Sequence, residues 1–458
     1  MFYLKQSMQT ILLFGAGKSS SYLVQYLLNQ AESNQYKLLV VDQDLKAIEK
    51  LTNKHNYSEA IVLDIFQEVE KRKTLIQSAK LVISMIPAHL HIDIAKDCIA
   101  YKKSMITASY ISPEMKSLDE EAKANGVLLL NEMGLDPGLD HMITMKVIND
   151  LKEKGGKMLL YESFCGGLVA PESDNNLWQY KFTWNPRNVV LAGQGGVSKF
   201  IQENKFKYIP YHKLFRRTEF MNIPGYGMFE GYANRDSLKY IKIYGLDDVK
   251  TMYRGTLRRV GFCKAWDILV QLGMTDDTYT IDGSESMTYR QFTNSFLSYH
   301  PTDSVELKLR HYLKLDHDDP LWFKLQEIDL FNADKKVGLK QATPAQILEK
   351  ILKDNWTLQE EDKDMIVMYN KFGYEMNGEL KQIDATLVCE GVNQTYTAMA
   401  KTVGMPVAIS ALMVFKNELN LTGVHLPILK EIYEPILEKL KDFDVEFKLF
   451  DTKYMGYI

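Results

Sequence analysis

The stretch ILLFGAGKSS, residues 11–20, decides how the first part of the chain folds. Its four apolar residues predict a buried strand, and the glycine turn that follows leads into a segment with helical periodicity. The letters GKSS also resemble a phosphate-binding loop of nucleoside triphosphatases. That loop needs a glycine five residues before Gly17, where Leu12 stands inside the predicted strand. The stretch therefore predicts a dinucleotide-binding turn built on Gly15 and Gly17.

Short apolar runs alternate with helical patterns through about residue 130. Continuous apolar strands separated by helices predict a parallel sheet covered on both faces. Six strands in this length suit an N-terminal Rossmann domain, a doubly wound parallel sheet, so we expect an α/β fold. The predicted strands are residues 11–14, 38–41, 60–63, 81–86, 104–109 and 127–130.

The predicted sheet places a cofactor at the carboxyl ends of its strands. Gly15 permits the tight turn, and Gly17 lets a pyrophosphate approach the helix N-terminus. Asp42 ends the second strand, where a carboxylate accepts the ribose hydroxyls and repels a 2′-phosphate, although it could also be a solvated acid. We therefore expect NAD and leave NADP open. The further residues expected around the cofactor are Lys18, Ser19, Asp64, Ile65, Ser84 and Ile86.

The rest of the chain changes texture twice. Glycines and aromatics are dense after the first domain, which predicts a mixed α/β substrate and dimerisation domain with long loops. A polar stretch with helical patterning then predicts a helical subdomain. We expect residues 1–133 as the first domain, 134–261 with 356–391 as the second, and 262–355 as the helical insertion. Residues 392–458 should pack back on the α/β body, through a long apolar helix at 397–419 that Gly404-Met405-Pro406 interrupts.

Composition excludes several classes of protein. The 458 residues are 46% hydrophobic with a net charge of −4, so no nucleic-acid partner and no membrane partner is expected. No stretch approaches the roughly 18 apolar residues of a membrane span, and no signal peptide is expected. Four cysteines without CxxC spacing favour a reducing cytoplasm, with neither a disulfide framework nor a metal site.

Arginines cluster beside glycines and aromatics in the second domain, in YANRDS and YRGTLRR. Guanidinium groups bind carboxylates through two parallel hydrogen bonds, so several of them suggest a substrate with more than one carboxylate. Surface or ion-paired arginines are the alternative. The residues concerned are Arg235, Arg254, Arg258 and Arg259.

Several long motifs, in order, resemble the saccharopine dehydrogenases of the L-glutamate-forming type, also called saccharopine reductases. They are NEMGLDPGLDHM, SFCGGLVAPESDNNLWQYKFTWNPRNV, ANRDS, RGTLRRVGF and AMAKTVGMPVAI. The resemblance implies cofactor contacts at Leu135 and Phe182. It implies substrate contacts at Ser109, Tyr110, Cys165, Asn185, Arg235, Thr256, Leu257 and Arg258. The chain departs from the family at Asn185, where a serine is usual, and in GAGKSSSY, which lacks the proline of the family's glycine motif.

The family interconverts saccharopine, NAD(P)+ and water with L-glutamate and 2-aminoadipate 6-semialdehyde, a step of lysine metabolism through aminoadipate. The resemblance therefore implies an oxidoreductase that acts on a CH–NH bond of a small molecule, and a homodimer. The reaction needs a base, for which Asp136, His141 and Tyr110 are the candidates, although Asp136 also suits a helix cap and His141 suits packing. Alternatives are a related imine reductase such as a carboxynorspermidine dehydrogenase, and a non-catalytic NAD-binding regulator. The physiological direction stays open.

Overall fold

The computed structural model describes residues 8–456, which form two compact units. Unit 1 runs to Gly155 and includes Thr395–Phe447, and unit 2 comprises Gly156–Gln394 and the chain from Lys448 onward. We expected the first domain to end at residue 133. The unit extends further because helix α7 (Leu139–Glu153) packs against the C-terminal helix α16 (Lys430–Leu440).

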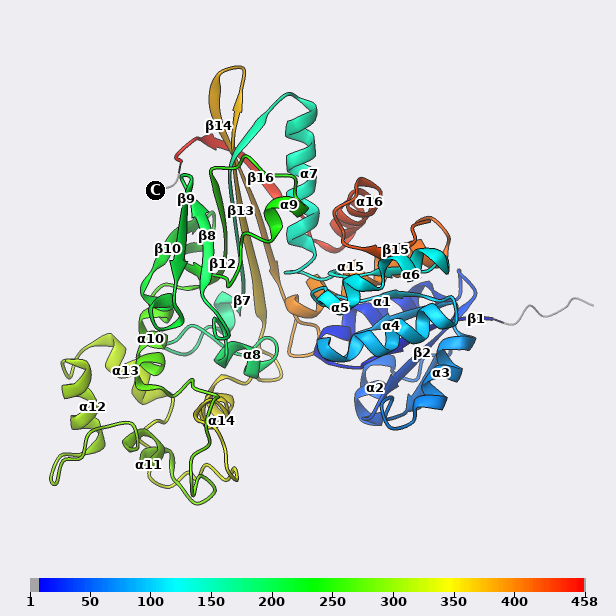
Figure 1. Cartoon of the computed structure of the whole chain (residues 1–458). Coiled ribbons are helices and arrows are strands. Elements are labelled where there is room, and N and C mark those ends of the chain that lie inside the picture. The colour runs from blue at the N-terminus through cyan, green and yellow to red at the C-terminus, as the bar shows by residue number, and fades with distance from the viewer. Residues whose placement is uncertain (1–7, 457–458) are drawn as a thin grey trace, which may run out of the picture. The chain divides into compact units, whose positions relative to one another are not determined.

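A seven-stranded parallel sheet forms the centre of unit 1 (Figure 1). The strand order is β15-β6-β5-β4-β1-β2-β3. From β1 the chain adds β2 and β3 on one side and then β4, β5, β6 and β15 on the other side, so the strand order reverses between β1 and β4. Open α/β sheets bind ligands in the crevice at the carboxyl ends of the two strands where this reversal occurs. The fold class predicted from the sequence is confirmed. The strands are β1 (Gln9–Phe14), β2 (Tyr36–Asp42), β3 (Ser58–Val62), β4 (Leu81–Ser84), β5 (Ser104–Ile106), β6 (Leu128–Leu130) and β15 (Gly423–His425).

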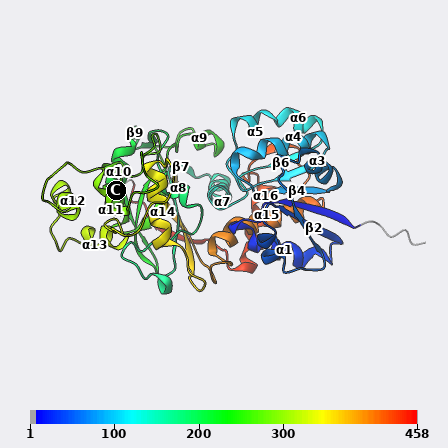
Figure 2. The same cartoon turned by 90° about the horizontal axis from the view of Figure 1, so that it is seen from below.

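Helices cover both faces of this sheet, as Figure 2 shows with α4 and α1 on opposite sides. Leu12 and Phe14 of β1 face one way and join a buried cluster with Ile76 of α3 and Ile94 of α4. On the other face α1 packs against α15. The remaining helices of unit 1 are α1 (Ser21–Ala31), α2 (Leu45–Thr52), α3 (Val69–Ser78), α4 (His91–Ala100), α5 (Pro113–Ser117), α6 (Asp119–Ala124) and α15 (Ala398–Phe415).

Helix α15 runs without a break through Gly404 and Pro406, so the expected interruption is absent. A Cβ on Gly404 would lie 2.9 Å from the backbone oxygen of Ser19, so only glycine lets the helix approach the glycine turn this closely. We expected no stretch resembling a membrane span. Among residues 8–456 only α15 is long and apolar enough to cross a membrane, and 78% of it is buried inside the fold. Packing in the core accounts for its apolar composition.

Unit 2 is built on a nine-stranded mixed sheet in which β7 and β12 are parallel and the other pairs antiparallel. The path is β10-β11-β12-β7-β13-β14-β16, and β8 joins it through β12 and carries β9. The C-terminal strand thus belongs to unit 2, whereas 395–447 belongs to unit 1. The strands are β7 (Lys157–Val169), β8 (Ser198–Gln202), β9 (Lys205–Ile209), β10 (Thr218–Ile223), β11 (Gly227–Ala233), β12 (Thr251–Arg259), β13 (Asp364–Met376), β14 (Glu379–Glu390) and β16 (Lys448–Lys453).

Five helices lie in the segment between β12 and β13 and gather beyond one end of the sheet (Figure 1). Buried aromatic side chains join two of these helices to the loop after β7: Trp266 of α10, Trp356 of α14 and Trp178 of the loop are fully buried, and their rings contact one another. The helices are α10 (Phe262–Leu272), α11 (Tyr289–Asn294), α12 (Val305–Leu313), α13 (Pro320–Glu327) and α14 (Pro344–Trp356), and α8 (Pro186–Val190) and α9 (Tyr240–Ile243) lie earlier in the chain.

Candidate functional site

The glycine turn of unit 1 has the geometry of a pyrophosphate-binding turn. Gly15 has φ +101°, and a Cβ there would lie 2.7 Å from the backbone oxygen of Met85, so this position requires glycine. A Cβ on Gly17 would meet no atom within 4 Å, which leaves space in front of the helix N-terminus. No side chain caps the helical turn that begins there. The uncapped N–H groups suit an anionic ligand, so the residues present fit a dinucleotide.

Asp42 holds the turn from the next strand. Its Oδ2 accepts a hydrogen bond of 2.8 Å from the backbone N of Ala16, and its Oδ1 accepts one of 3.0 Å from Asp44 N. The carboxylate is therefore fixed beside the glycine turn, at the position where a ribose-binding acid is expected. A 2′-phosphate at this place would meet a like charge.

The other predicted cofactor residues differ in exposure. Lys18 is exposed, and Ser19 and Ile86 are half-buried. Asp64 accepts hydrogen bonds from the backbone N of Phe66 and Gln67, so its carboxylate caps the turn after β3, and Ile65 is buried. Ser84 is completely buried at the end of β4.

A hydroxyl cluster lies at the carboxyl ends of β4 and β5, centred on a histidine that sequence reasoning missed. His91 Nδ1 is 2.8 Å from Ser84 Oγ, and His91 Nε2 is 2.8 Å from Ser109 Oγ and 3.2 Å from Thr107 Oγ1. Only 3% of His91 is exposed. Burial lowers the pKa of His91 to about 4, so the imidazole is neutral at physiological pH. We call Ser84, His91, Thr107 and Ser109 the His91 cluster.

Two of the predicted catalytic residues are hydrogen-bonded to each other. The Tyr110 hydroxyl donates to Asp136 Oδ1 over 2.8 Å. Tyr110 follows β5 and is 45% exposed, and the half-buried Asp136 lies in the loop after β6. Gly138 shapes this loop, since a Cβ there would lie 2.0 Å from the backbone oxygen of Gly134. The pair is thus held at the carboxyl edge of the parallel sheet, where it is accessible.

The third candidate, His141, is completely buried in α7. Its Nε2 is 2.6 Å from Glu132 Oε2, and the other carboxylate oxygen of Glu132 accepts a 2.9 Å hydrogen bond from the backbone N of Ile111. Glu132 has φ +58°, a conformation that side chains rarely adopt. His141 therefore supports Glu132, and Glu132 in turn fixes the backbone beside Tyr110.

Three of the predicted substrate residues, Cys165, Thr256 and Arg258, lie on one face of the sheet of unit 2. Cys165, Thr256 and Tyr232 are in register across β7, β12 and β11, so their side chains share that face. Thr256 Oγ1 donates to Asn234 Oδ1 over 2.8 Å. Arg258, two residues beyond Thr256, projects from the same face.

Arg258 is the most unusual group on this face because it is a buried cation. It is 4% exposed, and its guanidinium lies 5.0 Å from the ring centre of Tyr180 and 5.3 Å from that of Phe262. Its Nε has no hydrogen-bond partner, and no carboxylate among residues 8–456 forms an ion pair with it. Arg235, at the end of β11, likewise forms no ion pair within the described part of the chain. Buried cations normally have anionic partners, so this face suits a carboxylate ligand.

Three predicted residues of unit 2 have different surroundings. The Leu257 side chain is buried on the opposite face of the sheet, so only its backbone is available to the face of Arg258. Phe182 is buried, with its ring 5.5 Å from that of Trp356. Asn185 caps α8, its Oδ1 accepting a 2.9 Å hydrogen bond from Arg187 N. Asparagine and serine are both favourable N-cap residues, so either residue suits this position.

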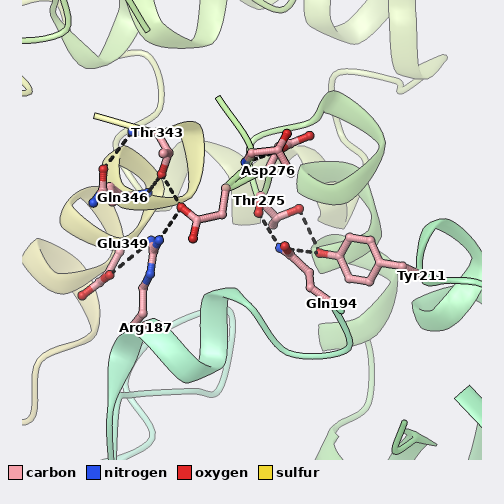
Figure 3. A network of polar contacts seen from close by, with 10 residues as sticks. Arg187, Gln194, Tyr211, Thr275, Asp276, Thr343, Gln346 and Glu349 are labelled. Carbon is pink, nitrogen blue, oxygen red and sulfur yellow. Dashed lines mark hydrogen bonds and ion pairs between the residues drawn. The ribbon is translucent and has the colours of Figure 1, made fainter. Parts of the chain in front are cut away.

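A polar network anchors the loop that carries Asn185 to the helical segment (Figure 3). Arg187 forms ion pairs with Asp277 and, over 3.7 Å, with Glu349 of α14. Thr343 donates to Asp277 over 2.6 Å. Farther along, Gln194 and Tyr211 both contact Thr275. These contacts hold residues 187–194 against the segment that contains α14.

His91 and Glu132 were absent from the predicted site because their partners lie far apart in the sequence. The only local signal for His91 was its position at the start of a helix that follows a strand end. The only one for Glu132 was its place directly after the sixth strand.

Two family models match the chain. One, described as the saccharopine dehydrogenase NADP binding domain, matches residues 11–130, and the other, the saccharopine dehydrogenase C-terminal domain, matches residues 134–445. The saccharopine dehydrogenase [NADP(+), L-glutamate-forming] of Schizosaccharomyces pombe is 31% identical over 444 residues, which cover 94% of this chain and 97% of that protein.

A second kind of relative is longer. The mitochondrial alpha-aminoadipic semialdehyde synthase of Mus musculus is 33% identical over 449 residues, covering 96% of this chain. The chain spans about half the length of these synthases, 48% in the mouse protein. Among solved structures, apo saccharopine dehydrogenase (L-Glu forming) from Saccharomyces cerevisiae superposes with a TM-score of 0.88 at 29% identity, covering 97% of this chain and 100% of that one.

Proposed function

Because the chain belongs to the saccharopine dehydrogenase family, we propose that it interconverts saccharopine, NAD+ and water with L-glutamate, 2-aminoadipate 6-semialdehyde and NADH. The buried guanidinium of Arg258, without a carboxylate partner in the described chain, is the observation that carries this proposal. Saccharopine has three carboxylates, and a desolvated guanidinium binds a carboxylate more strongly than an exposed one does. The chain also matches two enzymes named for this reaction over nearly the whole length of both sequences, and this match supports the same substrate.

The cofactor is a nicotinamide dinucleotide, which accepts a hydride from the carbon next to the secondary amine when it is bound. Gly15 and Gly17 would hold the pyrophosphate, and Asp42 the adenosine ribose. We expect NAD over NADP because of the Asp42 carboxylate, although the S. pombe relative is named for NADP(+). This preference is a property of one residue and is separable from the reaction itself.

Residues of unit 1 carry out proton transfer. Oxidation requires a neutral amine, and the imine that results must be hydrated before the C–N bond breaks. Asp136 and Tyr110 are accessible and joined by a hydrogen bond, so a proton taken up by one can be shared with the other. His141, completely buried against Glu132, supports this pair from behind. We therefore propose Asp136 with Tyr110 as the group that moves protons, and His141 as its support.

Residues of unit 2 bind the carboxylates of the substrate. Arg258 and Arg235 are the cations that bind them. The further contacts with the substrate are Thr256, Asn185, Cys165 and the backbone of Leu257. We also expect a homodimer in the cytoplasm. The family resemblance supports the dimer, and the four free cysteines agree with a reducing compartment.

A substrate panel tests the proposal. Purified protein is mixed with NAD+ and either saccharopine or carboxynorspermidine, and the absorbance of reduced nicotinamide is followed. The proposal predicts reduction with saccharopine alone. Reduction only with carboxynorspermidine would assign the chain to polyamine chemistry, and nucleotide binding without any turnover would make it a regulator.

A further inference from the structure

His91 occupies a position that couples two strand ends of unit 1. It is the first residue of α4, and the N-terminus of a helix that follows a parallel strand lies at the carboxyl edge of the sheet. From there the ring reaches Ser84 at the end of β4 and both Thr107 and Ser109 after β5. These hydroxyls are the only hydrogen-bond partners of the ring in the described chain.

The ring can give each neighbour only one kind of hydrogen bond. A neutral imidazole has one N–H donor and one acceptor nitrogen, so the nitrogen facing Ser84 and the nitrogen facing Ser109 have opposite roles. If Nε2 accepts, the Ser109 hydroxyl donates inward and its oxygen presents lone pairs outward. If Nε2 donates, the Ser109 hydroxyl proton points outward. In both cases the imidazole determines whether Ser109 is a donor or an acceptor toward a ligand.

Exposure separates the two ends of this chain of contacts. Ser84 is completely buried, whereas Ser109 is half-buried and so has a side open to a ligand. Thr107 Oγ1 additionally accepts a 3.3 Å hydrogen bond from Ser109 N, which orients the Ser109 backbone. Ser84 is thus held inside the fold, and Ser109 is the accessible hydroxyl whose hydrogen-bonding direction the ring determines.

We propose that His91 is a positioning residue for substrate binding, which orients the Ser109 hydroxyl and sets its hydrogen-bonding direction. The inference rests on the proposed function to the extent that Ser109 is taken as a substrate contact. It assigns no proton transfer to His91. Nε2 contacts the half-buried Ser109, whereas Nδ1 contacts the completely buried Ser84, so loss of the Nε2 contact alone should matter for the substrate and not for the cofactor.

Two conservative variants separate the ends of the ring. An asparagine amide reaches the position of Nδ1, so His91→Asn keeps a partner for Ser84 and loses the one for Ser109. A glutamine amide reaches the position of Nε2, so His91→Gln keeps the partner for Ser109. We expect His91→Asn to raise the KM for saccharopine about tenfold, the value of one hydrogen bond, with the KM for NAD+ unchanged. His91→Gln should recover most of this loss, and the exposed neighbour variant His89→Asn should have no effect.

A double-mutant cycle with Ser109→Ala gives the decisive comparison. If His91 acts through Ser109, His91→Asn adds nothing to the KM once Ser109 is alanine. Equal effects of His91→Asn in both backgrounds, or equal losses in His91→Asn and His91→Gln, would overturn the inference and leave His91 a packing residue.

A spectroscopic measurement keeps this test independent of turnover. In protein labelled with 15N-histidine, the His91 ring signals, identified by their loss in His91→Gln, should show one neutral tautomer at neutral pH. Ser109→Ala should shift the Nε2 signal, and an unchanged signal would overturn the inference. Failure of wild-type protein to oxidise saccharopine would reject the proposed function, while the ring signals would still decide whether His91 is coupled to Ser109.

Discussion

The Tyr110 hydroxyl donates a hydrogen bond of 2.8 Å to Asp136 Oδ1, joining the loops after β5 and β6 at the accessible edge of the parallel sheet. A phenol and a carboxylate in contact provide a donor and an acceptor that can exchange roles as a proton passes. The loops are held by Glu132, which binds the backbone N of Ile111 and is itself contacted by His141.

Asp136→Asn should lower kcat by about 10²- to 10⁴-fold, because an amide cannot take up the amine proton. Tyr110→Phe should lower kcat less, since the carboxylate remains. The measurement is kcat against pH for both variants, with NAD+ affinity as the control that the unit is folded. Wild-type turnover with a flat pH profile in Asp136→Asn would remove this residue from the mechanism.

Arg258→Met should raise the KM for saccharopine about ten- to a hundredfold, the value of a hydrogen bond to a charged group. Arg259→Met is the matched control, because Arg259 is the next residue of β12 and points to the other face, where it donates to the Tyr226 carbonyl. Steady-state kinetics with each variant make the comparison. Equal effects of the two substitutions would indicate a general disturbance of β12 and contradict the assignment.

Asp42→Asn should reduce the preference for NAD+ over NADP+ by on the order of tenfold, because two like charges about 4 Å apart repel by about 1–4 kcal/mol. Asparagine keeps one acceptor oxygen for Ala16 N, but its NH2 group cannot accept the hydrogen bond from Asp44 N, so the turn keeps one of its two hydrogen bonds to residue 42. The ratio of kcat/KM for the two cofactors is measured, with Asp64→Asn as the control at the next strand end. A wild-type preference for NADP+ would show that Asp42 does not act on the ribose as argued.

His91 should make the protein less stable in mild acid. The pKa of His91 falls from 6.5 in the unfolded chain to about 4 in the folded one, so protonation favours unfolding. Its stabilising contribution is complete above about pH 6.5 and is lost as the pH falls toward 4. Between about pH 7 and pH 5 the loss amounts to about 2 kcal/mol. Urea unfolding of wild type and His91→Gln at these two pH values should show a smaller decrease in the variant; equal decreases would contradict burial of a neutral ring.

Gly404→Ala should destabilise the protein, although alanine is the better helix former by about 1 kcal/mol. Its Cβ would lie 2.9 Å from the Ser19 oxygen and 3.1 Å from Leu23 N, so α15 must move away from the glycine turn. A lower melting temperature and weaker NAD+ binding are expected. A higher melting temperature would mean that the two helices can separate without cost.

The nucleotide-binding half could be predicted because its signals are local. An apolar strand, the glycines at 15 and 17, and an acid ending the second strand are all visible within one short stretch, and right-handed crossovers constrain the sheet order. The unbroken course of α15 through Pro406 was missed because burial of most of its side chains outweighs the lost backbone hydrogen bond.

The contacts that organise the site were harder to predict, for a physical reason. His91 joins residues from two strand ends, and Glu132 joins a loop to α7, so neither appears in the periodicity of any one segment. The burial of Arg258 depends on aromatic side chains as distant as Tyr180. Leu257 was placed with its neighbours in the motif, but alternation along β12 turns its side chain to the other face.

The most direct test of the central claim is the stoichiometry of the products. Wild-type protein is incubated with saccharopine and NAD+, and glutamate, 2-aminoadipate 6-semialdehyde and NADH are quantified by mass spectrometry and absorbance. The account predicts that the three products form in equal amounts. NADH formation without glutamate, or with lysine and 2-oxoglutarate as the products, would contradict it.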